Sequence, residues 1–414
     1  MDNELGARKL PIIEFLYMLV YASYTISPEL SKLPAVPFFG ITFCYLFYVI
    51  IRSKTGNNDN KILTYVLIAV YISLLYFLLT ETQTIDNKVD NYVLKLFIAK
   101  FQQMLYQIIP FVVMYRLLTA SSIIQCRIFL GVSFVCFAYT IWITNIFMTM
   151  YPGVVRSFAN SIEVAEETKG IGNFYFIYGT AALLPTLALV FVTYKNKIIK
   201  ILVSVSILLI YSFLMKAEFS LSIIIPTISI SYFCYKQLPE KNRPLIFLGI
   251  PVLFFLLPIF FRFVADNVEE GNDIKDRFME LSLLFSFQDT GGTAQDGTAR
   301  MEIYSNAIRV FLSSPIWGQA VDFDPHSTFF GFLCDIGLIG AIPYFFLYYS
   351  MNKYVYKYLN LPSESNYFKI SFLFIILMGF TNPVHSTSAL QFVIWCIAPL
   401  VINEILKYNA KYKI

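Results

Sequence analysis

Long apolar runs recur from one end of this chain to the other, and they constrain its fold more than any other feature. Hydrophobic residues make up 57% and charged residues 14% of the 414 positions, whereas soluble domains carry about 25% charged residues. Roughly 20 apolar residues cross a bilayer, and a segment in lipid must satisfy its own backbone polar groups, as a helix does. We therefore predict an all-α polytopic membrane protein with a single membrane-embedded domain over residues 1–414.

The apolar runs number about twelve, each long enough to cross the membrane. The predicted spans are 11–27, 34–51, 62–80, 98–118, 128–150, 173–193, 198–215, 219–235, 245–264, 327–349, 368–384 and 389–406. With this number, every connection on the side of the N-terminus carries Lys or Arg, while acidic residues concentrate on the other side. Basic loops stay in the cytoplasm, so we expect both termini to be cytoplasmic. The net charge of +4 gives no reason to expect a nucleic-acid partner.

One outer connection, residues 265–326, is far longer than the others, and it is polar and acidic. Within it, Ala299–Leu312 carries apolar residues at the spacing of one helix face. Thr298 is the expected N-cap, and Pro315 is expected to end the helix. The apolar face would lie on the membrane surface or on neighbouring spans. It consists of Tyr304, Ala307, Ile308, Phe311 and Leu312.

The chain has two histidines, and both fall at the outer surface. His326 ends the long loop, and His385 lies between the last two predicted spans. Imidazole is the side chain best suited to proton transfer near neutral pH. We interpret His326 as a candidate base, with interfacial hydrogen bonding as the alternative, and we assign only the interfacial role to His385.

Outer arginines could bind phosphate groups, because a guanidinium stays charged and binds phosphate oxygens in pairs. The alternative is that they pair with neighbouring acidic residues. We favour such pairing for Arg262 and Arg309, whereas both roles are open for Arg277 and Arg300. Arg156, in the shorter outer loop, is a further candidate. The sequence contains no metal-binding motif and no dinucleotide fingerprint, so we expect neither a metal nor a cofactor.

Several polar residues fall inside predicted spans. Lys100, Gln103 and Gln107 form a stripe at helical spacing, and Asp335 lies within the span that follows His326. Ionisable groups in a membrane are candidates for function. They can also form a buried structural pair, and we favour that interpretation here.

The region from the long loop into the next span resembles the shared C-terminal region of bacterial O-antigen polymerases and O-antigen ligases. The resemblance rests on Gly297–Arg309 (GTARMEIYSNAIR), Ser314–Gly318 (SPIWG) and His326–Gly340 (HSTFFGFLCDIGLIG). The family pattern is an Arg that opens a loop helix, a turn with Pro and then Gly, and a His followed by Asn, Ser or Gln. A Gly-x-x-Gly follows, and here it is Gly337–Gly340.

The resemblance implies a glycosyltransferase of the GT-C type that uses sugars on undecaprenyl pyrophosphate. It gives His326 the role of base and Arg300 the role of the opening arginine. Arg277 matches an earlier loop arginine less closely. Ligases often carry an Arg at the outer end of the eighth span, where this chain has Lys216. This departure from the pattern argues against a ligase, although Lys216 could supply the charge. With Arg156, these residues are the candidate ligands of the pyrophosphate.

The function that this resemblance implies is polymerisation of lipid-linked repeat units into O-antigen or capsular polysaccharide at the bacterial inner membrane. Donor and acceptor would both be undecaprenyl-pyrophosphate-linked oligosaccharides, and a chain-length regulator protein is a further expected partner. Two alternatives are a ligase that moves the polymer to lipid A core and a flippase for lipid-linked oligosaccharide. The nearly uncharged spans argue against the flippase, which would be expected to show a charged cavity at the midplane.

Overall fold

The computed structural model describes most of the predicted membrane-spanning part of the chain. The described residues are 9–27, 35–53, 60–81, 90–151, 171–217, 220–237, 239–242, 295–319, 327–359, 375–380 and 388–412, with isolated positions between 256 and 282 and at 373. These residues form an α-helical bundle and contain no β-strand. The all-α class predicted from the sequence is confirmed.

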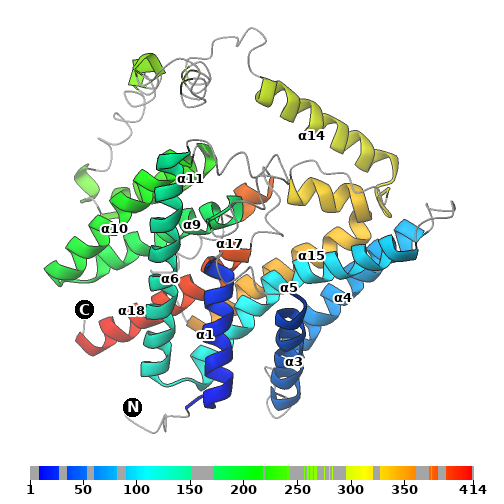
Figure 1. The fold of residues 1–414 in the computed structure, drawn as a ribbon, viewed down its shortest axis with the longest axis horizontal. Helices are drawn as coiled ribbons and strands as arrows, with labels where there is room; N and C mark the ends of the chain where they lie inside the picture. The colour runs from blue at the N-terminus through cyan, green and yellow to red at the C-terminus, as the bar shows by residue number, and fades with distance from the viewer. Residues whose placement is uncertain are drawn as a thin grey trace.

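The longer helices of the described part follow the chain order in Figure 1. They are α1 (Ile12–Ile26), α3 (Ala35–Ser53), α4 (Asn60–Glu81), α5 (Asp90–Ala120), α6 (Ile123–Met150), α9 (Phe174–Thr193), α10 (Lys197–Lys216), α11 (Ser220–Gln237), α14 (Gln295–Ser313) and α15 (Thr328–Leu359). The last span begins with α17 (Ser388–Phe392), passes through a π-helical turn η3 (Val393–Ile397) and ends as α18 (Ala398–Tyr412).

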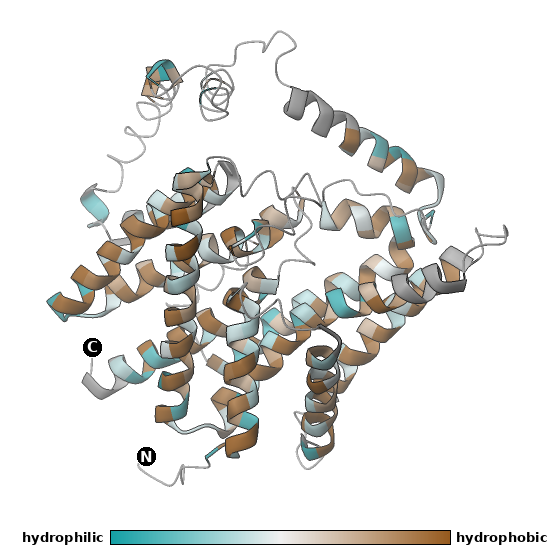
Figure 2. Cartoon of the chain, viewed as in Figure 1, coloured by the Kyte–Doolittle hydropathy of each residue, from teal (hydrophilic) through white to brown (hydrophobic). Residues whose placement is uncertain are grey.

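Seven helices in the described residues are long and apolar enough to cross a membrane, and Figure 2 shows apolar residues along their length. The chain is therefore a multi-pass membrane protein. Helix α9 and the last span are buried over most of their length, whereas α10 exposes most of its residues. Helix α9 packs against α10, α11 and α17, and α4 packs against α5 and α15. The exposed apolar face of α10 is thus suited to lipid.

The bundle has two distinct ends. The start of α1 and the end of α18 lie at one end, which we call the terminal end, and α14 lies at the opposite end, which we call the loop end (Figure 1). At the terminal end, the buried Glu14 of α1 accepts two hydrogen bonds from Arg116 of α5, at 2.7 and 3.0 Å. Arg52 of α3 lies 3.5 Å from the same carboxylate. These contacts fix one end of α1, α3 and α5 at a common depth.

Each predicted span coincides with a described helix, except 245–264 and 368–384, which lie largely outside the described residues. The total of twelve spans therefore stays a prediction. The predicted N-cap Thr298 is wrong, because α14 already begins at Gln295. Helix α6 begins at Ile123, earlier than expected, because Ser122 and Gln125 form a capping box. Hydropathy alone does not detect the first turns of α14 and α6, because these turns contain polar residues.

Candidate functional site

Helix α15 is broken near the loop end. Gly337 has φ 55° and ψ −162°, a conformation that essentially only glycine adopts. Because of the break, the amides of Leu338 and Ile339 do not donate along the helix. Such unpaired groups are costly at membrane depth, and irregular backbone occurs there only where other protein groups satisfy it.

The turn that follows α14 satisfies this break. The Leu338 amide donates to the carbonyl of Pro315 at 2.9 Å, and the Ile339 amide donates to the carbonyl of Ile316 at 3.2 Å. In the opposite direction, the backbone N–H of Gln319 donates to the backbone carbonyl of Cys334 at 2.8 Å. The Pro-then-Gly turn and the Gly-x-x-Gly segment, which the sequence resemblance treats as two separate motifs, therefore form one hydrogen-bonded unit.

Gly318 allows the turn to approach α15 closely. Its φ is +73°, and a Cβ at this position would overlap the backbone of Asp335 and Ile336. The side chains of Ile316 and Trp317 are more than half exposed, so they point away from the bundle. An exposed Trp at the end of a membrane bundle is typical of the interface between lipid and water.

Helix α14 packs on the first half of α15, as the amphipathic pattern predicted. Ala307 is fully buried, and its carbonyl accepts a hydrogen bond from the Cys334 thiol at 3.1 Å. The rings of Tyr304 and Phe330 lie 5.4 Å apart. Ile308 and Leu312 stay largely exposed, which leaves an apolar edge for the membrane surface. The predicted apolar face is thus divided between α15 and the outside of the bundle.

Asp335, the buried acidic residue next to the break, is hydrogen-bonded to a tyrosine, and a lysine lies against the ring of that tyrosine. The Tyr76 hydroxyl of α4 donates to Asp335 Oδ2 at 3.0 Å. Lys100 of α5 places its Nζ 4.5 Å from the centre of the Tyr76 ring. Lys100 and Asp335 are both buried, so α4, α5 and α15 meet through polar groups directly beneath the turn. This arrangement agrees with the buried structural role that we favoured.

A chain of hydrogen bonds continues from α5 toward the middle of the bundle. Gln107 donates to the Tyr344 hydroxyl at 3.2 Å, and Tyr344 donates to the Tyr348 hydroxyl at 3.2 Å. The side-chain amide of Gln391 also donates to Tyr348, at 2.9 Å, and its oxygen accepts from the Trp395 indole at 2.8 Å. All five residues are buried, so this network fixes α5, α15 and the last span to one another.

Sequence reasoning identified Gln107 but missed its partners and missed Tyr76. A signal existed for Gln391, an amide near the start of an apolar span with Trp395 four residues later on the same helix face. Tyrosines gave no comparable signal, because interfacial and lipid-facing tyrosines are common in membrane proteins.

The catalytic candidates fall mostly outside the described residues. His326, Arg277, Arg156 and His385 lie there entirely. Arg300 belongs to α14, although its side chain is outside the described part. Ser327, the residue after His326, is buried and donates from its hydroxyl to the carbonyl of Gly379 at 3.0 Å. The chain next to His326 is therefore anchored at the start of α15.

Lys216 is the one predicted phosphate ligand with a described side chain. It ends α10 at the loop end, is exposed, and donates to the Thr149 hydroxyl of α6 at 3.1 Å. It therefore lies at the same end of the bundle as α14, and its predicted outer location stays a prediction. Arg309, for which we favoured pairing with acidic neighbours, is exposed on α14.

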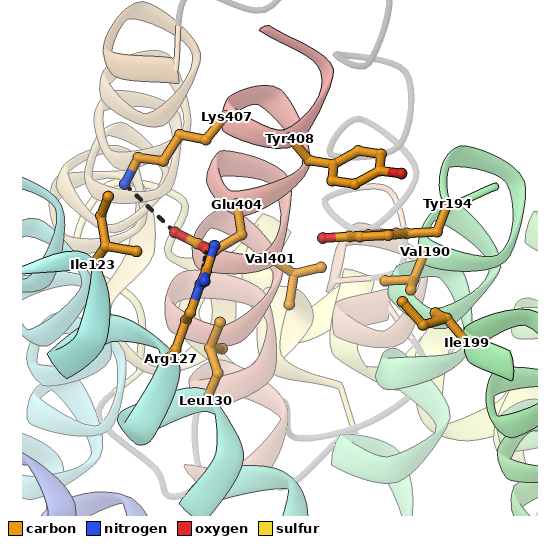
Figure 3. A pocket seen from close by; sticks show the side chains of 10 residues that line it. All are labelled: Ile123, Arg127, Leu130, Val190, Tyr194, Ile199, Val401, Glu404, Lys407 and Tyr408. Carbon is orange, nitrogen blue, oxygen red and sulfur yellow. Dashed lines mark hydrogen bonds and ion pairs between the residues drawn. The ribbon is translucent and has the colours of Figure 1, made fainter. Parts of the chain in front are cut away.

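A cavity of about 780 Å³ opens at the terminal end, between α6, α9, α10 and α18. Figure 3 shows that its charged groups point toward one another. Arg127 Nε lies 2.9 Å from Glu404 Oε2, and Lys407 Nζ lies 3.5 Å from Glu404 Oε1. On the other wall, the rings of Tyr194 and Tyr408 lie 4.5 Å apart. These charged groups already pair with one another, and the pairs connect α6 with α18. None of the predicted site residues that the structure describes lines this cavity.

Comparison with known proteins gives no match: no protein-family model and no curated protein matches this sequence. The geometry at the loop end is therefore the main basis for a functional proposal.

Proposed function

We propose that this protein is a polytopic glycosyltransferase of the GT-C type that polymerises lipid-linked glycan repeat units on the outer face of a bacterial inner membrane. Donor and acceptor are both oligosaccharides on undecaprenyl pyrophosphate. The acceptor hydroxyl oxygen attacks the anomeric carbon of the donor sugar, and the bond from that carbon to the pyrophosphate oxygen breaks. His326 takes the hydroxyl proton, and undecaprenyl pyrophosphate leaves.

The observation that carries this proposal is the docking of the Pro315–Gly318 turn into the break of α15. The hydrogen bonds from Leu338 and Ile339 to this turn tie the end of α14 to the start of α15. The helix that contains Arg300 and the residue that follows His326 consequently belong to one hydrogen-bonded unit at the loop end. A base and a fixed positive charge held by a common framework are what such a transfer requires.

The chemistry is reasonable without a metal. A polyprenyl pyrophosphate is a good leaving group, so the protein must chiefly position the two substrates and stabilise the departing charge. Arg300, Arg277, Arg156 and Lys216 are the proposed ligands of the pyrophosphate. Lys216 supports this reading by its exposed position at the loop end. A chain-length regulator would act on the same face.

Deletion of the gene tests the proposal and separates it from its alternatives. Loss of a polymerase leaves lipid A core with a single repeat unit, visible as one band above core in a gel of the lipopolysaccharide. Loss of a ligase leaves bare core, with long polymer retained on the lipid carrier. Loss of a flippase leaves single repeat units on the cytoplasmic face. Either of the last two patterns would contradict polymerisation.

Complementation with point variants tests the assigned residues. We expect His326→Ala and Arg300→Ala to stop chain growth while the protein still accumulates in the membrane. The matched controls are His385→Ala, for the only other histidine, and Arg309→Ala, for an exposed arginine on the same helix. Both controls should keep long chains. Normal chain lengths with His326→Ala would remove His326 from the mechanism.

A further inference from the structure

A second cavity, of about 450 Å³, lies at the loop end of the bundle. The residues that line it include Ile26 at the end of α1, Asn173 at the start of α9 and Ser388 at the start of α17. Its size falls within the range of small-molecule sites, about 300–1,000 Å³. The cavity therefore opens on the same end of the bundle as α14 and the docked turn.

The wall of this cavity is aromatic. Tyr24 and Phe38 are stacked, with ring centroids 3.7 Å apart, and Tyr106 and Tyr175 contribute further rings. Flat aromatic faces bind the C–H faces of pyranose rings, and tyrosine adds a hydroxyl at the edge of the ring. This wall is suited to a ring that is apolar on its faces and polar on its rim.

The polar groups of the cavity are uncharged. The amide of Gln102 donates to the Tyr106 hydroxyl at 2.7 Å, so that the tyrosine proton is available to a ligand. Gln103 Oε1 is buried and has no hydrogen-bond partner among the described residues. A buried acceptor without a partner is costly, and a ligand hydroxyl that donates to it would remove this cost.

None of the described residues that line the cavity carries a charge. The cavity is consequently unsuited to a pyrophosphate or a carboxylate, which require positive partners when they are buried. It differs in this respect from the cavity at the terminal end, which contains Arg127, Glu404 and Lys407.

We propose that the loop-end cavity binds a neutral sugar residue of the lipid-linked glycan, with its ring against Tyr24 and Phe38 and a hydroxyl donating to Gln103. The lipid-linked identity of that glycan rests on the proposed function, whereas the preference for a neutral sugar rests on the cavity itself. The uncharged lining excludes uronic acids from this position and thereby restricts which repeat units the protein accepts.

Saturation-transfer NMR on the full chain in lipid nanodiscs tests this inference. The probes are N-acetylglucosamine, N-acetylgalactosamine, galactose and glucose, with glucuronic acid as the charged analogue of glucose. At least one neutral sugar should receive saturation, and glucuronic acid should receive little. The variant Gln103→Leu should weaken binding about 10-fold, as expected for loss of one buried hydrogen bond. Tyr24→Leu is a second variant that should also weaken binding.

The matched control is Tyr139→Leu, which removes an exposed tyrosine from α6 and should leave sugar binding unchanged. Absence of binding by every neutral sugar, or equal binding by wild type and both cavity variants, would overturn the inference. The assay needs no transferase activity, so it is independent of the proposed function. A deletion strain with normal polysaccharide, together with intact sugar binding, would reject the transferase and retain the sugar site.

Discussion

At Gly337 a single residue determines whether the site framework can form. Its φ of 55° and ψ of −162° lie in a region that side chains avoid, and a Cβ there would overlap the carbonyl of Ile316 in the docked turn. Both the backbone conformation and the close approach therefore require glycine. The break at Gly337 leaves the backbone N–H groups of Leu338 and Ile339 without partners in the helix. The docked turn accepts hydrogen bonds from both of them.

Gly337→Ala should destabilise the protein by about 2 kcal/mol or more, because it adds backbone strain and steric overlap. The matched control is Gly131→Ala on α6, where nothing lies within 4 Å of the added Cβ and alanine favours the helix. Thermal unfolding in detergent, followed by size-exclusion chromatography, measures the difference. A Gly337→Ala melting temperature equal to that of the control would show that the break is not as described.

Between elements, two ion-pair clusters at the terminal end hold helices at a common depth. Glu14 and Glu404 each bind one Arg closely, at 2.7 and 2.9 Å, and a second cation at 3.5 Å. The two clusters differ in burial: the Arg116 side chain is 14% exposed, whereas that of Arg127 is 70% exposed. The two clusters therefore allow an Arg–Glu ion pair with a buried arginine to be compared with one whose arginine is exposed to solvent.

Arg116→Ala should cost about 3–5 kcal/mol, because it leaves the buried Glu14 carboxylate poorly compensated. Arg127→Ala should cost about 1 kcal/mol or less, since water screens the exposed pair. Unfolding of both variants in a graded denaturant series provides the measurement. Equal losses in the two variants would mean that burial does not decide the strength of these pairs.

Sequence patterns predicted the helices well and their irregularities poorly. Lipid imposes helices on apolar runs, so the described spans follow from composition. The break at Gly337 could not be predicted, because Gly-x-x-Gly in a span is equally compatible with an unbroken, closely packed helix. The same holds for the π-turn Val393–Ile397. The capping box of Ser122 and Gln125 did carry a signal, but it lies outside the apolar run that defined the span.

For the site, spacing placed Lys100, Gln103 and Gln107 on one face of α5, and this placement is confirmed. The contacts they make could not be predicted from spacing, because Tyr76 and Tyr344 come from helices distant in sequence. The resemblance likewise identified the turn and the Gly-x-x-Gly segment without indicating that they bind each other. Pairings between distant segments require the three-dimensional arrangement.

At the scale of the whole molecule, the two ends of the bundle differ in chemistry. The terminal end contains the ion pairs of Glu14 and Glu404, and the loop end contains the docked turn, α14 and the uncharged aromatic cavity. Which end faces the cytoplasm stays a prediction from the distribution of basic residues. The proposed transferase requires the loop end to face outward, where flipped lipid-linked glycans are present.

Cysteine labelling in intact cells tests this orientation most directly. Ser305→Cys places a thiol on the exposed side of α14, and Lys195→Cys places one in the exposed connection between α9 and α10 at the terminal end. A membrane-impermeant maleimide should label Ser305→Cys in intact cells and should label Lys195→Cys only after permeabilisation. The reverse pattern would place the loop end in the cytoplasm and contradict the proposed function.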